Sequence, residues 1–242
     1  MSSDTFYLHR ITQKFKAEAE QLFGNHIVSL IAYGSAATDE YVHKKSDINI
    51  LLVLDEEGIL NLHAARKKIA AWYKRGLHTL FLTESYIERS LDSFPIEFLN
   101  MKSAYHVVTG KDVLQSLEFD RHNIRLQCER ELKGNLIHLR QRFVLNLGDK
   151  NELMLLIGES LGAFAAIFRA LLYLKVTEVP INKLDVTRQA CKDFAMDEDL
   201  FSQLISIRRG EEKPSIEELE TLVGSYIRQI DALSRYVDDM QL

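Results

Sequence analysis

The pattern of hydrophobic and polar positions changes near residue 117. Before that point, short apolar runs alternate with amphipathic segments, a pattern typical of strands and helices that follow one another. After it, apolar residues recur at spacings of three and four to the end of the chain, as on one face of an α-helix. We therefore expect an α+β fold, with a mixed-sheet domain over residues 1–117 and an all-α domain over residues 118–242.

The first domain is predicted to be a mixed sheet with flanking helices. Apolar residues from Leu8 to Leu22 predict an opening helix that stops at Gly24. An alternation of Phe94, Ile96 and Phe98 with other residues predicts a late strand. The expected strands are 27–33, 47–54, 77–82 and 94–99, with an extended piece at 105–108, and the expected helices after the first are 59–72 and 83–91.

The second domain is predicted to be an up-down helical bundle of four or five helices. Its segments are 120–147, 153–174, 182–194, 198–208 and 215–240. Ser215 and Glu218 have the spacing of a capping box at the start of the last one. Each apolar stripe has to be buried against another helix. The same apolar stripes could be buried in a closed monomeric bundle or in a homodimer formed through the bundle, and the sequence does not distinguish these two arrangements.

The segment from Leu153 to Leu174 is apolar enough to raise the question of a membrane span. It contains Arg169, and an arginine at the centre of a spanning helix costs roughly 2.5–3.5 kcal/mol. We therefore interpret the segment as the buried central helix of the bundle.

The clearest chemical motif joins the first two predicted strands. Gly34-Ser35 follows the first apolar run, and after eleven intervening residues Asp47-Ile48-Asn49 opens the second one. Glycine lets a phosphate approach backbone N–H groups, and the serine hydroxyl adds a donor. Asp47 and Asn49 are two apart on a strand and so share a face. Their oxygens suit Mg²⁺. The structural alternative is a common tight turn followed by a buried strand.

This motif resembles the signature of the DNA polymerase beta-like nucleotidyltransferase superfamily over residues 33–50. The joining of a small α+β domain to a helical bundle is similar to the aminoglycoside nucleotidyltransferases. The resemblance implies transfer of a nucleoside monophosphate, with ATP as the expected donor, to a hydroxyl of a small-molecule acceptor. Gly34, Ser35 and Ser46 would then hold phosphates, and Asp47 and Asn49 would bind Mg²⁺.

The superfamily carries a third acid on a later strand, where it serves as metal ligand or general base, and Glu97 on the predicted strand 94–99 is our candidate for it. The alternative is an exposed glutamate on an edge strand. The sequence departs from the superfamily pattern at Asn49, where a second carboxylate is usual. A second functional hypothesis is therefore a catalytically weak or inactive relative that binds nucleotide or a partner protein.

Composition narrows the functional classes to which the protein could belong. A net charge of −5 over 242 residues argues against a broad nucleic-acid surface, which needs clustered cations. Two cysteines are too few for a disulfide framework, and residues 1–10 show no secretory leader, so we expect a cytoplasmic protein. The histidines show no metal-ligand spacing. Lys44 and Lys45 are interpreted as solvated, and the basic residues of segment 121–142 mostly as partners of neighbouring acids.

Overall fold

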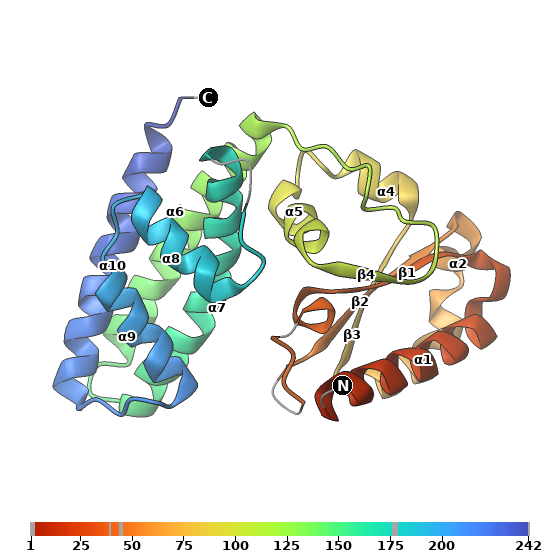
Figure 1. Ribbon diagram of the computed structural model, residues 1–242, viewed down its shortest axis with the longest axis horizontal. Helices are drawn as coiled ribbons and strands as arrows, with labels where there is room; N and C mark the ends of the chain where they lie inside the picture. The colour runs from red at the N-terminus through yellow and green to blue at the C-terminus, as the bar shows by residue number, and fades with distance from the viewer. Residues whose placement is uncertain (1–2, 39, 44–45, 176–178, 242) are drawn as a thin grey trace. The chain divides into compact units, whose positions relative to one another are not determined.

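The computed structural model describes residues 3–38, 40–43, 46–175 and 179–241. The chain forms two compact units, Met1–Phe119 and Asp120–Leu242. The sequence had predicted a domain boundary after residue 117. The first unit contains a mixed sheet with flanking helices and the second is helical (Figure 1). The predicted α+β fold class is confirmed.

The sheet has four strands: β1 (Ile27–Tyr33), β2 (Ile48–Leu54), β3 (Leu77–Leu82) and β4 (Tyr105–Gly110). Their order is β3-β2-β1-β4. β1 is antiparallel to β2 and to β4, whereas β2 is parallel to β3. From Ile50 to Leu54 the side chains of β2 are completely buried, which is the consequence of a central position with cover on both faces.

Helices α1 (Ser3–Phe23) and α3 (Arg66–Tyr73) pack on one face of the sheet. The rings of Phe15 and Trp72 lie 4.4 Å apart in this core, and both side chains are fully buried. Helices α4 (Glu84–Arg89) and α5 (Pro95–Ser103) lie over the other face (Figure 1). The helix predicted over 59–72 is interrupted, because α2 (Glu56–Leu60) and a 3₁₀ turn, η3 (Leu62–Ala65), precede α3.

The predicted strand at 94–99 is wrong, because these residues belong to helix α5. Pro95 occupies the first turn of the helix, where its fixed φ and missing N–H are tolerated. The buried side chains of α5 recur at the helical spacing of three and four. They are Pro95, Ile96, Phe98, Leu99 and Met101. A short alternating run satisfies both periods, so the alternation did not discriminate between them.

The second unit consists of α6 (Arg121–Leu145), α7 (Lys150–Lys175), α8 (Lys183–Asp193), α9 (Glu198–Arg209) and α10 (Ile216–Asp238). Helix α7 contacts each of the other four helices. Ser215 caps α10 by accepting a hydrogen bond from the Glu218 N–H at 3.2 Å, and Glu218 accepts one in return from the Ser215 N–H at 2.6 Å. The predicted capping box is confirmed.

Within the described ranges, α7 is the one helix long and apolar enough to cross a membrane, and 61% of its apolar stretch is buried inside the structure. Arg169 is buried and donates hydrogen bonds to the carbonyls of Pro180 and Ile181, the second at 2.7 Å. A buried arginine is tolerated when it is hydrogen-bonded in this way. These contacts support the interpretation of α7 as the core helix of the bundle.

The basic residues of α6 are engaged within the bundle. Glu129 binds both Arg125, at 3.2 Å, and Lys133, at 2.7 Å. Arg140 binds Asp231 at 2.8 Å, and Arg142 binds Glu159. The predicted pairing with neighbouring acids is confirmed, and these contacts account for much of the positive charge of this helix.

Candidate active site at the end of the sheet

A glycine turn closes one end of the sheet. Strand β1 ends at Tyr33 and passes into a 3₁₀ turn, η2 (Gly34–Ala37). Gly34 has φ +69°, a left-handed conformation that favours glycine. Its N–H donates to the carbonyl of Ala104, which follows α5 directly, at 2.9 Å. The turn is thereby attached to the end of α5.

The strand register aligns four side chains beside this turn. Asn49 of β2 pairs with His78 of β3 on one side and with Tyr33 of β1 on the other, and Tyr33 in turn pairs with Tyr105 of β4. A Cβ added to Gly34 would lie 3.5 Å from Nδ2 of Asn49. Burial raises the pKa of the Tyr33 phenol, so that this side chain is a neutral hydroxyl at pH 7. Asn49 therefore lies between His78 and Tyr33 in the row, next to the turn.

Asp47 lies immediately before β2, with 66% of its side chain exposed. Its Oδ1 is 3.3 Å from Nε2 of His78. The Ile48 N–H donates to the carbonyl of Gly76 at 2.9 Å, which holds the start of β3 beside Asp47. The structure thus places Asp47 and Asn49 at the same end of the sheet as Gly34, with His78 beside Asp47.

His78 is a site residue that the sequence analysis missed. It is 31 positions from Asp47, and no local spacing links the two residues. The link is the parallel register of β2 and β3, which is a property of the assembled sheet. The ring of Tyr73 lies 4.4 Å from that of His78 and restricts its orientation.

Glu97 lies in the first turn of α5, with an exposed side chain. Its assignment as the third acid depended on a strand that does not exist. Ala104, which binds Gly34, is seven residues further along, and at 1.5 Å per residue this separation is roughly 10 Å along a helix. The face of a strand therefore no longer supports the assignment of Glu97 as the third acid, which stays a prediction.

Ser46 closes the loop that leads into the site. Its Oγ accepts a hydrogen bond from the Val42 N–H at 3.2 Å, and its own N–H donates to the Val42 carbonyl at 2.9 Å. These two contacts use a lone pair of the oxygen and leave the hydroxyl proton unused, so far as the described residues go. Lys44 and Lys45 lie outside the described residues.

Among the described residues, Asp47 contributes a carboxylate to this end of the sheet, Asn49 an amide and His78 an imidazole. The described part of the chain contains no group of three or more His, Cys, Asp or Glu side chains arranged to hold a metal ion. A divalent cation here would therefore complete its coordination with water or with phosphate oxygens, as Mg²⁺ commonly does.

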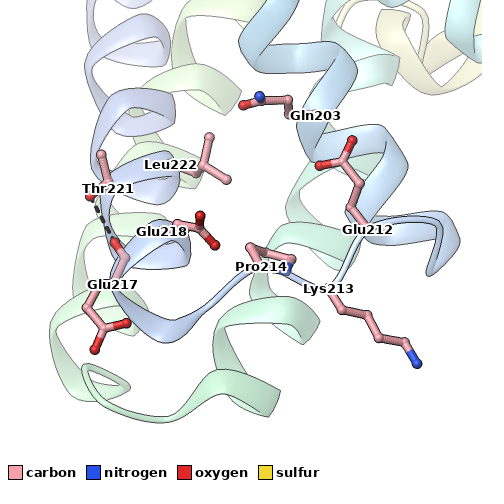
Figure 2. Close-up of a pocket in the computed structure, with 8 residues that line it drawn as sticks. All are labelled: Gln203, Glu212, Lys213, Pro214, Glu217, Glu218, Thr221 and Leu222. Atoms are coloured by element: carbon pink, nitrogen blue, oxygen red, sulfur yellow. Dashed lines mark hydrogen bonds between the residues drawn. The ribbon is translucent and has the colours of Figure 1, made fainter.

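A separate hollow of 580 Å³ lies in the bundle, between α9 and the start of α10 (Figure 2). Glu212, Glu217 and Glu218 line it. Glu218 belongs to the capping box, and acids in a first turn stabilise a helix. The start of α10 accounts for Glu217 and Glu218, whereas Glu212 belongs to the loop between α9 and α10.

The arrangement of the sheet, the glycine turn and the bundle defines a nucleotidyltransferase fold with a C-terminal helical bundle. Among solved structures, the chain is similar to the spectinomycin adenyltransferase AAD(9) from Enterococcus faecialis, solved with ATP and spectinomycin. The two chains are 10% identical, with a TM-score of 0.56 over 92% of this chain and 99% of that chain. No family model and no curated protein sequence matches the chain. The predicted resemblance is confirmed at the level of the fold.

Proposed function

We propose that this protein is a nucleotidyltransferase that moves a nucleoside monophosphate, AMP from ATP, to a hydroxyl of a small-molecule acceptor. The observation that carries the proposal is the meeting of Gly34, Asp47 and Asn49 at one end of the sheet. The fold supports it, because a structurally similar protein is an adenyltransferase solved with ATP and spectinomycin. We also expect a cytoplasmic location and no nucleic-acid or membrane partner.

The turn after β1, η2, would bind the triphosphate. The N–H of Gly34 is engaged by Ala104, so phosphate oxygens would meet the Ser35 amide and hydroxyl instead. The absence of a side chain at Gly34 keeps this approach open. The hydroxyl of Ser46 would add a further donor from the opposite side of the loop.

Asp47 and Asn49 would hold a divalent cation, for which Mg²⁺ is the candidate that two oxygen ligands and a triphosphate favour. Such a cation neutralises the charge that develops on the phosphates during transfer. The exposure of Asp47 leaves room for substrate oxygens in the same coordination shell. The residues of the chain then orient the α-phosphate for in-line attack by the acceptor hydroxyl.

One observation favours a second candidate function, a catalytically weak relative that binds nucleotide or a partner protein. The site has an amide at Asn49, and the described part of the chain contains no cluster of three potential His, Cys, Asp or Glu ligands. An amide oxygen binds a hard cation without contributing negative charge. Turnover is the property that separates the two candidates.

The test is release of pyrophosphate from ATP with Mg²⁺ or Mn²⁺, with and without a panel of small hydroxyl compounds. Asp47→Ala should abolish release, by at least 100-fold, and preserve the melting temperature, because Asp47 is an exposed residue that precedes its strand. Asp92→Ala, an exposed aspartate in the same unit, is the matched control and should turn over normally. Equal turnover by Asp47→Ala and wild type would contradict the proposal, whereas ATP binding without turnover in wild type would favour the second candidate.

A further inference from the structure

The proposed transfer needs a group that takes a proton from the acceptor hydroxyl. A hydroxyl attacks phosphorus efficiently only as it loses its proton, and a positioned base that accepts this proton contributes about 10²–10⁴-fold to the rate. In the proposed site the carboxylate of Asp47 is committed to the cation. A different side chain is therefore required for the proton.

The row of paired side chains at the end of the sheet offers one such group. Directly paired residues on neighbouring strands carry their side chains on the same face, and the row consists of His78, Asn49, Tyr33 and Tyr105. The amide of Asn49 has no titratable group. Burial raises the pKa of the phenols of Tyr33 and Tyr105, which keeps both as neutral hydroxyls. Within this row, the proton acceptor is the imidazole of His78.

We propose that His78 is the general base of the transfer and accepts the proton of the acceptor hydroxyl. The proposal rests on the proposed function for the reaction and goes beyond it in naming the base. In this step the O–H bond of the acceptor breaks, and the proton moves to a ring nitrogen of His78. The acceptor oxygen forms a bond to the α-phosphorus of ATP. The bond from that phosphorus to the oxygen of the β-phosphate breaks, and pyrophosphate leaves with the electron pair.

The position of His78 suits this role. Its Nε2 lies 3.3 Å from Oδ1 of Asp47. It also pairs with Asn49, whose amide nitrogen lies beside Gly34. The imidazole is therefore next to the residues proposed to hold the triphosphate. An acceptor hydroxyl has to arrive at this place for in-line attack.

The ring of His78 is both oriented and accessible. The side chains of Ile48 and Ile50 enter the core against α1, so Asn49 between them, and its partner His78, face away from that core. The ring of Tyr73 lies 4.4 Å from the imidazole and restricts its orientation. The His78 side chain is 33% exposed, so a substrate can reach it.

The contact with Asp47 has a competing explanation, an ion pair with a protonated His78 that takes no part in the chemistry. Its length of 3.3 Å exceeds the roughly 2.7–2.9 Å of a charge-assisted hydrogen bond, so the two groups are not tightly bonded. A second His–Asp pair provides a matched control. Nδ1 of His26 lies 3.0 Å from Oδ2 of Asp55, at the opposite end of β1 and β2 from Gly34.

The experiment measures pyrophosphate release from ATP by the full-length protein, with Mg²⁺ and a panel of glycerol, glucose and myo-inositol. His78→Gln should lower kcat roughly 100-fold or more and leave the KM for ATP and the melting temperature close to those of wild type. His78→Glu restores a proton acceptor and should keep kcat within about tenfold of wild type. His78→Arg keeps a cation beside Asp47 but supplies no base, so it should be as slow as His78→Gln. His26→Ala should match wild type.

The ion-pair explanation predicts the reverse order. Activity in His78→Arg together with loss in His78→Glu would overturn the proposal and leave the ion pair. Equal kcat in His78→Gln and wild type would also overturn it, and a loss in Glu97→Gln instead would assign the base to the predicted third acid. Failure of the proposed function has a different signature. Wild type that binds ATP and releases no pyrophosphate would overturn that function, and the base with it.

Discussion

At the scale of single residues, Asn49 brings no negative charge to the proposed Mg²⁺ site, because its side chain is an amide. Asn49→Asp would place a second carboxylate two residues after Asp47, which directly precedes β2, so we expect Mg²⁺ to bind at least tenfold more tightly in the presence of ATP. Calorimetric titration of Mg²⁺ measures the change. Asn151→Asp, which adds the same charge to an exposed position of α7, should leave the affinity unaltered. If Asn49→Asp also leaves it unaltered, Asn49 is not a ligand.

The backbone at Gly34 is a second residue-scale feature that the site requires. Alanine there would adopt φ +69°, a conformation that costs roughly 1–2 kcal/mol per residue for a side chain with a Cβ. Gly134 lies within α6, and a Cβ there meets nothing within 4 Å. We expect Gly34→Ala to lower the free energy of unfolding and Gly134→Ala to raise it by about 0.5–1 kcal/mol. Urea denaturation of both variants measures the two changes, and equal signs would contradict this account.

The sequence predicted the residues of the site that lie close together in the chain. Gly34 begins the turn η2, Asn49 lies on β2 and Asp47 directly precedes β2, so their common position at one end of the sheet follows from local geometry. His78 was missed because its contact with Asp47 depends on which strands pair and in what register. Glu97 was misplaced because Phe94, Ile96 and Phe98 fit a strand as well as they fit one face of a short helix.

At the element scale, helix α1 is attached to α3 through a half-buried carboxylate. Glu18 accepts hydrogen bonds from Trp72 Nε1 and from Arg75, each at 2.6 Å. Burial acts to raise the pKa of Glu18, but the hydrogen bonds from Arg75 and Trp72 outweigh it and lower the pKa to about 2. The ionised form is therefore favoured in the folded state.

This shift predicts an acid-sensitive attachment of α1. A carboxylate whose pKa is lower in the folded state contributes stability above its unfolded pKa and loses it as the pH falls toward the folded pKa. Glu18→Gln should therefore cost about 2 kcal/mol at pH 7, and the difference from wild type should shrink between pH 4.5 and pH 2. Free energies of unfolding across this range measure it. Glu20→Gln, which removes an exposed partner of Lys16, should change little at any pH, and a pH-independent cost for Glu18→Gln would refute the ionic explanation.

The longer elements were predictable because their hydrophobic period extends over many residues. The stripe of α10 repeats from Leu219 to Val237, and the capping box at Ser215 marks its start. The segment around α2 and α3 is too short and too polar for its period to reveal an interruption at η3. Arg169 shows a further limit, because the carbonyls of Pro180 and Ile181 that it binds come from a loop after α7.

At the scale of the whole molecule, two units with separate buried cores predict two unfolding transitions. Phe15 and Phe168 have 0% and 1% exposure in the first and second unit respectively. Replacement of either by alanine should cost about 3–5 kcal/mol. Calorimetry of the full chain should show Phe15→Ala lowering one transition and Phe168→Ala lowering the other. A single transition lowered by both variants would mean that the units unfold as one.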